Sequence, residues 1–425
     1  MTTVEELHKR FLEYPLVSTD SRKIEADCIF FALKGPNFDG NTFAREALEK
    51  GAAFVVIDNP DYHWEGKTLL VKDVLTALQE LARYHRHYCN ARVIALTGSN
   101  GKTTTKELIY SVLSGKYRTI ATKGNLNNHI GVPLTLLSIQ ADTEFAIIEM
   151  GANHQKEIAF LSNIAEPDFG YITNFGKAHL EGFGGVEGVI KGKSELYDFL
   201  TANNKHAFLN ADDPIQVEKL SGYVRKIGFS QTDPQYFNIR FLRADPFVWL
   251  EIEDTVIKTQ LIGEYNFSNC CVALLIGKYF NVPLESMKEG IENYVPENNR
   301  SQVLHHKHFK IIMDAYNANP SSMKVALEQF GKMKEDPKIA FLGDMFELGE
   351  DAEREHQQIA ELAASLNLEE VFLVGENFYR TQTELQKFPS FDSLSSHLKT
   401  SPLSSGTLLI KGSRGMALER LLEVL

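Results

Sequence analysis

The chain has 425 residues, 43% hydrophobic and 24% charged, a composition typical of a globular protein too long for one core. Its formal net charge of −12 argues against general nucleic-acid binding, which requires a basic face. The four cysteines show neither a metal-binding spacing nor a disulfide pattern, so we expect buried free thiols in a reducing cytoplasm; they are Cys28, Cys89, Cys270 and Cys271.

Residues 1–82 are predicted to form a small N-terminal α/β domain. A helical pattern at 42–51 separates two of its apolar runs; the predicted strands are 29–33, 53–57 and 69–71. The N-terminal segment lacks the apolar core of a signal peptide, and no apolar run approaches the ~20 residues that cross a bilayer. We therefore expect no membrane span.

Residues 83–298 are predicted to form a central domain, entered through a helix at 73–88. Its pattern alternates buried strands with helices, which argues for a mostly parallel sheet with helices on both faces. The predicted strands are 93–97, 145–150, 169–173 and 207–209, and the predicted helices are 102–113 and 267–280. The more polar, alternating segment 237–261 is predicted to be antiparallel.

Residues 299–425 repeat one strand–helix pattern. The predicted strands are 310–315, 339–344, 371–375 and 407–412, and the last helix is predicted at 415–424. This indicates a doubly wound, Rossmann-like sheet, in which ligands bind beyond the carboxyl ends of the strands. The fold class is therefore α/β with three domains, the central one of the phosphate-loop type.

The stretch TGSNGKTTT (97–105) lies between a predicted buried strand and a predicted helix. Backbone N–H groups and the helix N-terminus there would cradle an anion, with Lys102 at the terminal phosphates and the Thr103 hydroxyl on Mg²⁺. The predicted ATP-binding residues of the loop are Gly98, Ser99, Asn100, Gly101, Lys102, Thr103 and Thr104. A plain turn is the alternative, and the absence of an NKxD tetrapeptide counts against a GTPase.

TGSNGKTTT resembles the ATP loop of the Mur ligases, which lack the outer glycine of GxxxxGK[ST]; Leu96 stands there in this chain. Further motifs follow in the order of that family over nearly the whole chain: KGNLNNHIGVP, IIEMGANH, ITNFGKAHLEGFGG, GKSEL, LNADDP and GEYNFSN. The opening segment 19–43 and the motifs DAYNANPSSM, LGDMFELG and KGSRGM are most similar to the branch that adds D-alanyl-D-alanine.

Three residues are candidates for metal binding beside Thr103. Glu149 ends a predicted buried strand, where a carboxylate suits Mg²⁺, although a lone glutamate there is otherwise a solvated one. The resemblance alone implies that His179 binds a second Mg²⁺ and that Lys193 is carbamylated into an anionic ligand. From its spacing alone Lys193 is an ordinary helix-surface lysine, and Lys191 is a rival for its position.

The resemblance implies that ATP drives amide formation through an acyl phosphate, with two Mg²⁺ ions as cofactors. The substrates would be UDP-N-acetylmuramoyl-tripeptide and D-alanyl-D-alanine, and the catalytic residues Lys102, Glu149, His179 and Lys193. The nucleotide would also contact Asn266, Asn269, Arg300, Tyr316, Asn317 and Asn319. Substrate-binding residues would be Ser21, Arg22, Gly35, Asp39, Gly40, Asn125, Asn127, Asn128, Lys411, Ser413 and Arg414.

Two kinds of alternative remain open. Another Mur-type ligase or folylpolyglutamate synthase would share the ATP machinery, but DAYNANP stands where the preceding ligase carries a DNPR-type motif. A nucleotide-binding regulatory protein that had lost catalysis would be expected to lack Lys102, Glu149, His179 or Lys193, and all four are present. We expect a monomer that closes its domains over small-molecule substrates and binds no nucleic acid.

Overall fold

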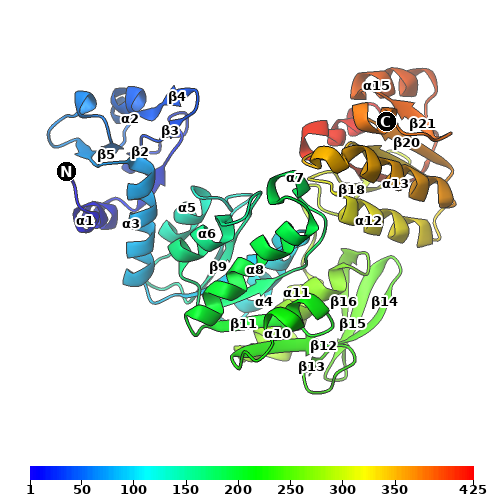
Figure 1. Cartoon of the computed structure of the whole chain (residues 1–425), viewed down its shortest axis with the longest axis horizontal. Helices are drawn as coiled ribbons and strands as arrows, with labels where there is room; N and C mark the ends of the chain where they lie inside the picture. Colours follow the sequence, from blue (N-terminus) through cyan, green and yellow to red (C-terminus); the bar gives the residue numbers. More distant parts are fainter.

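The computed structural model describes the whole chain, Met1–Leu425, as three α/β units in sequence order (Figure 1). The N-terminal unit has a four-stranded parallel sheet in the order β1-β2-β5-β6. Its strands are β1 (Leu16–Ser18), β2 (Cys28–Phe31), β5 (Phe54–Ile57) and β6 (Thr68–Leu70). β2 is buried at every residue, as expected of a parallel strand covered on both faces.

Short elements complete this unit. Helix α1 (Val4–Glu13) starts from a capping box, in which the Thr3 side chain accepts from the Glu6 N–H and the Glu6 carboxylate accepts from the Thr3 N–H. The remaining elements are β3 (Lys34–Gly35), β4 (Phe38–Asp39), η1 (Gly40–Phe43), α2 (Ala44–Glu49) and η2 (Pro60–Tyr62).

Helix α3 (Val74–Tyr88) joins the first two units. It starts at Asp73, whose carboxylate accepts from the Thr76 N–H, and it packs on α1 as well as on α5 (Gly131–Leu137) and α6 (Glu157–Ala165). The predicted domain boundary at 82 therefore falls inside a continuous helix.

The central sheet has seven parallel strands in the order β13-β12-β11-β10-β7-β9-β8. They are β7 (Arg92–Thr97), β8 (Thr119–Ala121), β9 (Phe145–Glu149), β10 (Phe169–Ile172), β11 (His206–Asn210), β12 (Lys226–Ser230) and β13 (Phe237–Asn238). The sequence predicted the four central strands. It missed those at the two sides of the sheet, which are short or carry polar residues and so give little periodic signal.

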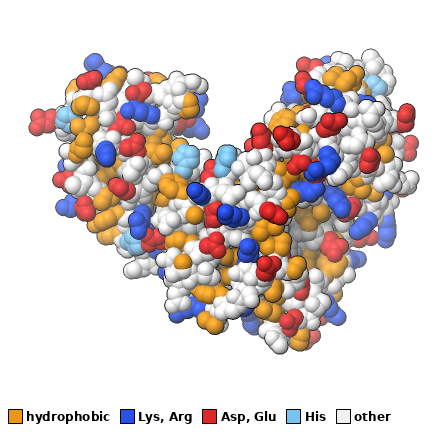
Figure 2. Space-filling view, viewed as in Figure 1, with side chains coloured by type: hydrophobic (Ala, Val, Ile, Leu, Met, Phe, Trp, Pro, Cys, Tyr) orange, Lys and Arg blue, Asp and Glu red, His pale blue; other side chains and the backbone are white.

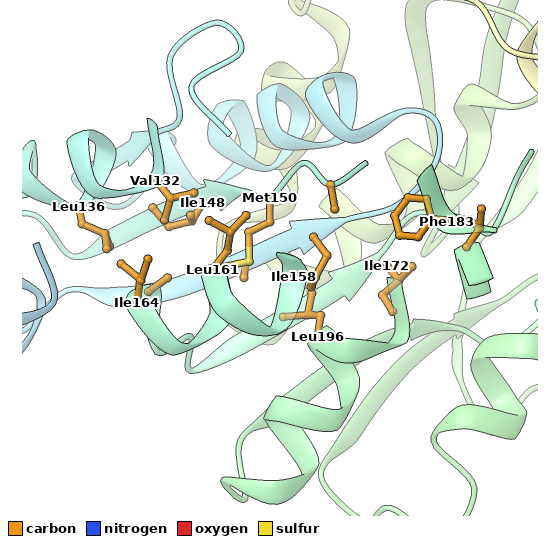
Figure 3. Close-up of a cluster of buried hydrophobic side chains, with 14 of the residues drawn as sticks. Val132, Leu136, Ile148, Met150, Ile158, Leu161, Ile164, Ile172, Phe183 and Leu196 are labelled. Carbon is orange, nitrogen blue, oxygen red and sulfur yellow. The ribbon is translucent and has the colours of Figure 1, made fainter. Parts of the chain in front are cut away.

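Alternate residues of the central strands face two different cores, as the pleat of a strand requires. On β7, Val93 and Ala95 belong to one core, while Ile94 and Leu96 belong to the other. The first core lies under α5, α6 and α8 (Val186–Ala202); Figure 3 shows its side chains. The second lies under α4 (Lys102–Ser114), α10 (Asn266–Tyr279) and α11 (Leu284–Glu292).

An antiparallel three-stranded sheet packs on the α10–α11 side of the central unit. Its strands are β14 (Arg240–Ala244), β15 (Phe247–Ile252) and β16 (Thr255–Ile262). The antiparallel prediction for 237–261 is therefore confirmed from Arg240 on, but it is wrong for Phe237–Asn238, which form β13 and pair in parallel with β12. Two short helices, α7 (Leu180–Phe183) and α9 (Pro214–Lys219), follow β10 and β11.

The C-terminal unit has a six-stranded sheet in the order β17-β18-β22-β19-β20-β21, in which only β17 is antiparallel. Its strands are β17 (Gln302–His306), β18 (Phe309–Asp314), β19 (Lys338–Gly343), β20 (Glu370–Val374), β21 (Gln386–Phe388) and β22 (Gly406–Lys411). Its helices are α12 (Pro320–Lys332), η3 (Gly349–Asp351), α13 (Ala352–Ser365), α14 (Glu376–Tyr379) and α15 (Phe391–Thr400).

The predicted final α-helix at 415–424 is wrong. The segment forms two 3₁₀ helices, η4 (Arg414–Met416) and η5 (Leu418–Glu423). Ala417 between them has φ 47°, a left-handed conformation that an α-helix cannot contain. Leu418 and Leu421 are both buried, and a three-residue spacing places side chains on one side of a 3₁₀ helix.

The N-terminal and C-terminal units stand on opposite sides of the central unit, with a wide hollow between them (Figures 1 and 2). The central and C-terminal units touch directly, through α7 and η3 among other elements. No helix in the molecule combines the length and the apolarity that a membrane crossing demands.

Candidate active site

A cleft of ≈ 1130 Å³ lies between the central and C-terminal units. Segments that follow the carboxyl ends of β7, β8, β9 and β10 line it, together with segments that follow β18 and the last residue of β22. Ligands bind at this edge in parallel α/β sheets. The predicted residues that line it are Ser99, Asn100, Gly101, Lys102, Thr103, Thr104, Asn125, Asn127, Asn128, Glu149, His179, Asn266, Asn269, Arg300, Tyr316, Asn317, Asn319 and Lys411.

The other predicted residues do not line this cleft. Gly98, in the loop itself, packs against Thr173: a Cβ there would come within 1.9 Å of the Thr173 hydroxyl oxygen. Ser413 is buried and accepts from the Phe346 N–H, and Arg414 forms an exposed ion pair with Glu419. Five residues belong to the N-terminal unit: Ser21, Arg22, Gly35, Asp39 and Gly40. Lys193 lies behind the wall of the cleft, where its Nζ donates to the Ala152 carbonyl oxygen.

The glycine loop turns directly into helix α4 at Lys102. Gly101 has φ 78°, and a Cβ there would lie 2.9 Å from the Asn269 Oδ1, so both its conformation and its packing favour glycine. The Lys102 Nζ folds back on the loop and donates to the carbonyl oxygens of Gly98 (2.8 Å) and Ser99 (3.4 Å).

Two cations from different units converge on this loop. Loss of solvent lowers the pKa of Lys102; Arg300 of the C-terminal unit lowers it further, while Glu149 opposes the shift. Arg300 itself stacks on Tyr316, with its guanidinium carbon 3.5 Å from the ring centroid. Two positive groups that line the cleft beside a helix N-terminus are suited to a polyanion such as a triphosphate.

Glu149 is a buried carboxylate, only 1% exposed. It accepts from the Thr103 hydroxyl (2.9 Å) and from the Asn127 amide (2.8 Å), and none of the ion pairs in the structure includes it. A buried carboxylate with neutral donors alone is costly unless a cation accompanies it. Together with the Thr103 hydroxyl it fits a Mg²⁺ ion, which prefers such oxygen donors.

Lys193 is fully buried on α8, so the surface-lysine alternative is wrong, whereas its rival Lys191 is exposed. Its Nζ donates to the Ala152 carbonyl oxygen (3.1 Å) and lies 4.8 Å from the centroid of the Phe183 ring. Burial sets the pKa of Lys193 well below that of a free lysine, and the charge of Lys102 lowers it further. Burial and the charge of Lys102 thus favour the neutral, nucleophilic form of the amine, which bonds to Ala152 in the cleft wall.

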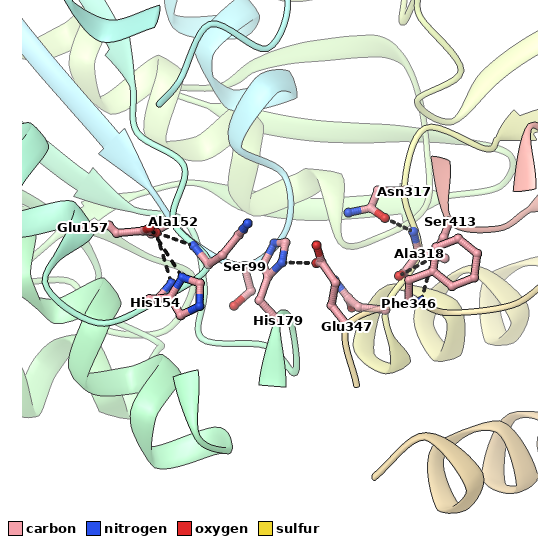
Figure 4. A network of polar contacts seen from close by, with 12 residues as sticks. Ser99, Ala152, His154, Glu157, His179, Asn317, Ala318, Phe346, Glu347 and Ser413 are labelled. Carbon is pink, nitrogen blue, oxygen red and sulfur yellow. Dashed lines mark hydrogen bonds and ion pairs between the residues drawn. The ribbon is translucent and has the colours of Figure 1, made fainter. Parts of the chain in front are cut away.

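His179 is the N-cap residue of α7 and has φ 53°. Its Nδ1 contacts the carboxylate of Glu347 from the C-terminal unit (Figure 4). As they stand, no three side chains of the types His, Cys, Asp and Glu come together in a metal-binding group.

The C-terminal unit touches the glycine loop itself. Asn319 starts α12 with a capping box, and its Nδ2 donates to the Asn100 Oδ1 across the cleft (2.7 Å). The Asn317 Oδ1 accepts from the Ala318 N–H, and Lys411 forms a buried ion pair with Asp314 (2.5 Å).

Asn266 and Asn269 use their amides inside the protein. Asn269 accepts from the Thr105 hydroxyl (3.0 Å) and donates to the Asn266 Oδ1 (2.8 Å), while Asn266 donates to the Ile262 carbonyl oxygen (2.8 Å). These bonds hold α10 against the start of α4 and so fix the floor of the loop.

The predicted substrate residues of the N-terminal unit lie around two tight turns. Arg22 donates two 2.8 Å hydrogen bonds to Asp20, which lowers the pKa of that carboxyl to about 2. A Cβ on Gly40 would lie 2.3 Å from the Leu33 carbonyl oxygen, so the loop closes tightly on β2. Asn41 ties this loop to Asp58 through a 2.8 Å bond.

Several residues that line the cleft were not predicted from the sequence. Asn174, Asp314 and Ser321 lie within motifs already recognised, and their side chains had simply not been singled out. Asn174 is the clearest, because its Oδ1 accepts from the Asn100 N–H of the glycine loop (3.1 Å). Glu157 and Phe160 lie on α6, where helical periodicity gave no sign that they face a cleft.

Three family descriptions match this chain. "Mur ligase family, catalytic domain" matches residues 13–86, "Mur ligase middle domain" matches 96–277, and "Mur ligase, glutamate ligase domain" matches 299–399. Together these segments cover most of the chain.

Curated relatives match along nearly their full length. UDP-N-acetylmuramoyl-tripeptide–D-alanyl-D-alanine ligase of Bacillus subtilis is 35% identical, covering 96% of this chain and 92% of its own. The Escherichia coli ligase of the same name is 33% identical, covering 99% and 95%.

Solved structures agree. A MurF crystal structure from Acinetobacter baumannii has a TM-score of 0.87 and 29% identity, covering 99% of this chain and 98% of that one. MurF ligase from Thermotoga maritima, solved in complex with ADP, has a TM-score of 0.85 and 26% identity, covering 97% of each chain.

Proposed function

This chain belongs to the Mur ligase family, and we propose that it uses ATP to join D-alanyl-D-alanine to UDP-N-acetylmuramoyl-tripeptide in peptidoglycan precursor synthesis. The observation that carries this function is the match to ligases of that name at 33–35% identity over at least 96% of the chain. It is an ATP-dependent ligase that acts on small-molecule substrates.

The reaction needs anionic groups brought together. The terminal carboxylate of the tripeptide attacks the γ-phosphorus of ATP, the bond to ADP breaks, and an acyl phosphate forms. The amine of D-alanyl-D-alanine then attacks the acyl carbon, and inorganic phosphate leaves as the amide forms. Lys102 and Arg300, which converge on the loop, are assigned to the phosphates, where catalysis depends on position and charge.

Two Mg²⁺ ions are part of the proposal. Thr103 and Glu149 would hold one, because Glu149 is a buried carboxylate that accepts from neutral donors and forms no ion pair. His179 and a carbamylated Lys193 would hold the other, because burial lowers the pKa of the Lys193 amine and so favours the neutral form that reacts with CO₂. When bound, these ions neutralise charge on the phosphates and on the carboxylate substrate.

Each unit receives one task in this proposal. Residues 1–82 bind the UDP end, residues 83–298 bind ATP, and residues 299–425 close over both. The contact between Asn319 and the glycine-loop residue Asn100 supports closure. A closed cleft would exclude water from the acyl phosphate, which otherwise hydrolyses. We further propose that the protein acts as a monomer and that it works in the cytoplasm. Light scattering of the purified protein would test whether it is a monomer.

An ATP-hydrolysis assay tests the function. Phosphate release should require UDP-N-acetylmuramoyl-tripeptide. The amide product should form only when D-alanyl-D-alanine is added as well. A panel with diaminopimelate, glutamate and folate in place of the dipeptide provides the comparison. Turnover with glutamate and folate alone would assign the chain to folylpolyglutamate synthesis instead.

A further inference from the structure

We propose that Glu347 is a positioning residue that orients His179 from the C-terminal unit, so that the His179 metal site is complete only when that unit is docked on the central one. The inference rests on the proposed function, since it concerns the same metal-dependent site. It adds a residue that lies outside the cleft lining and outside the residues predicted from the sequence.

The side-chain contact defines the role. The carboxylate of Glu347 meets the Nδ1 of His179, which leaves the Nε2 as the nitrogen available to a ligand (Figure 4). A histidine that binds a metal commonly donates its other ring N–H to a carboxylate, which fixes the tautomer and the ring orientation.

The backbones of the two residues meet as well. His179 and Glu347 both have left-handed conformations, φ 53° and φ 61°, which non-glycine residues adopt only where the surroundings impose them. The Glu181 N–H donates to the Glu347 carbonyl oxygen (3.3 Å), and a Cβ on Gly349 would lie 3.2 Å from the Glu181 side chain. The two segments are therefore fitted to each other.

The Glu347 loop is fixed on its own side too. The Met345 N–H donates to the His356 Nε2 (2.9 Å), and the Phe346 N–H donates to the Ser413 hydroxyl (2.9 Å). Glu347 is thus delivered by a rigid part of the C-terminal unit, and it reaches His179 only when that unit is docked.

Docking itself does not depend on Glu347. The Lys177 Nζ pairs with the nearly buried Glu355 (2.7 Å), and the Lys177 N–H donates to the Ser321 hydroxyl (2.8 Å). The Asn319–Asn100 bond adds a third contact. Removing the Glu347 carboxylate should therefore leave the units together and affect only the orientation of His179.

The test measures Mn²⁺ binding to the full chain by electron paramagnetic resonance, in the presence of a non-hydrolysable ATP analogue. The variants are Glu347→Ala, Glu347→Gln and His179→Ala. The matched control is Glu350→Gln, which alters an exposed glutamate of the same loop that forms no ion pair. Circular dichroism and small-angle scattering confirm that each variant is folded and docked.

We expect His179→Ala to abolish one of two bound Mn²⁺ ions. Glu347→Ala should weaken that same ion about 10- to 100-fold, and Glu347→Gln, which keeps an acceptor oxygen, should weaken it less. The other ion and the control should be unchanged, and Glu347→Ala should have no further effect when His179 is already alanine.

The outcomes separate the two proposals. Unchanged Mn²⁺ affinity in Glu347→Ala, with a clear loss in His179→Ala, overturns the role of Glu347 alone. Unchanged binding in His179→Ala overturns the metal site of the proposed function. If Glu347→Ala does not fold, Glu347→Gln decides, and wild-type affinity in that folded variant would overturn the positioning role.

Discussion

At the scale of single residues, Lys102 shows how a positive charge in the cleft suits the binding of an anion. Desolvation lowers its pKa; Glu149 opposes this shift and Arg300 adds a smaller lowering, so a bound anion would favour the charged form of Lys102. The Lys102 Nζ donates to the loop carbonyl oxygens of Gly98 and Ser99.

Replacing Lys102 with alanine should lower the rate of phosphate release about 10³-fold, because a positioned cation on the transferred phosphoryl group is lost. A steady-state phosphate assay measures the change. Lys116→Ala, at the other end of α4, is the control and should retain activity. An active Lys102→Ala variant would contradict the role assigned to the loop.

Lys193 makes a separate prediction, because only the neutral amine reacts with CO₂. With its pKa held well below that of an ordinary lysine, Lys193 should carry a carbamate at neutral pH and lose it as the pH falls through the lowered pKa. Carbon-13 magnetic resonance of protein equilibrated with labelled bicarbonate should show the carbamate signal and its loss on acidification.

The matching variants separate Lys193 from its neighbour. Lys193→Ala should lose the signal and nearly all activity, and a small carboxylate should restore part of that activity. Lys191→Ala changes an exposed lysine two residues away and should leave both unchanged. Full activity in Lys193→Ala would refute the carbamate.

At the scale of elements, the turn into α4 requires glycine at position 101 both for its backbone conformation and for its packing. A comparison with Gly66 separates these two reasons. Gly101 and Gly66 have nearly the same left-handed φ, 78° and 76°, but a Cβ meets Asn269 at Gly101 and nothing within 4 Å at Gly66. Alanine at either site costs about 1–2 kcal/mol in backbone strain.

Gly101→Ala should therefore lower the midpoint of thermal unfolding more than Gly66→Ala, since overpacking adds about 1–3 kcal/mol. It should also weaken ATP binding, because Asn269 must leave its bonds to Thr105 and Asn266. Calorimetry measures both effects. Equal effects of the two substitutions would show that Asn269 packing does not matter.

Helix α3 contains a pH-sensitive contact between units. The His8 Nε2 lies 3.1 Å from the His85 Nδ1, and the His85 Nε2 lies 2.8 Å from the Ile139 carbonyl oxygen, an arrangement that neutral rings satisfy. Burial lowers the pKa of both histidines. The unfolded chain then binds more protons below its histidine pKa of about 6.5, so stability is full above that pH and falls as the pH drops.

Thermal unfolding between pH 7.5 and about 5 should show this loss, and His85→Gln should flatten the curve by removing one titrating group. His206 and His356 also have lowered pKa values, so the slope should shrink without vanishing. A pH dependence identical to that of the wild type would refute a contribution from this pair.

At the scale of the whole molecule, the three units are placed for closure. The C-terminal unit already contacts the glycine loop, while the N-terminal unit stands apart across the hollow (Figure 2). Small-angle scattering should show a smaller radius of gyration when ATP and UDP-N-acetylmuramoyl-tripeptide are both bound. Lys102→Ala under the same conditions is the control. An unchanged radius in the wild type would remove the support for closure.

The sequence by itself determined the local features of this protein. Buried parallel strands such as 93–97 are continuous apolar runs, and the glycine loop, Glu149 and the family motifs are contiguous in the chain. Such features depend on neighbours only a few residues away, so a single sequence contains their full signal. The short edge strands and the two C-terminal 3₁₀ helices on either side of Ala417 were not predicted, because their periodicity is weak or broken.

Only the tertiary structure decided what depends on distant parts of the chain. Lys193 appeared as a surface lysine by spacing and is buried because α8 packs its face onto the segment after β9. Glu347 and His179 are 168 residues apart, and their contact exists because two separately folded units dock. Burial and contacts between units arise from packing across the fold, and no local pattern of residue types encodes them.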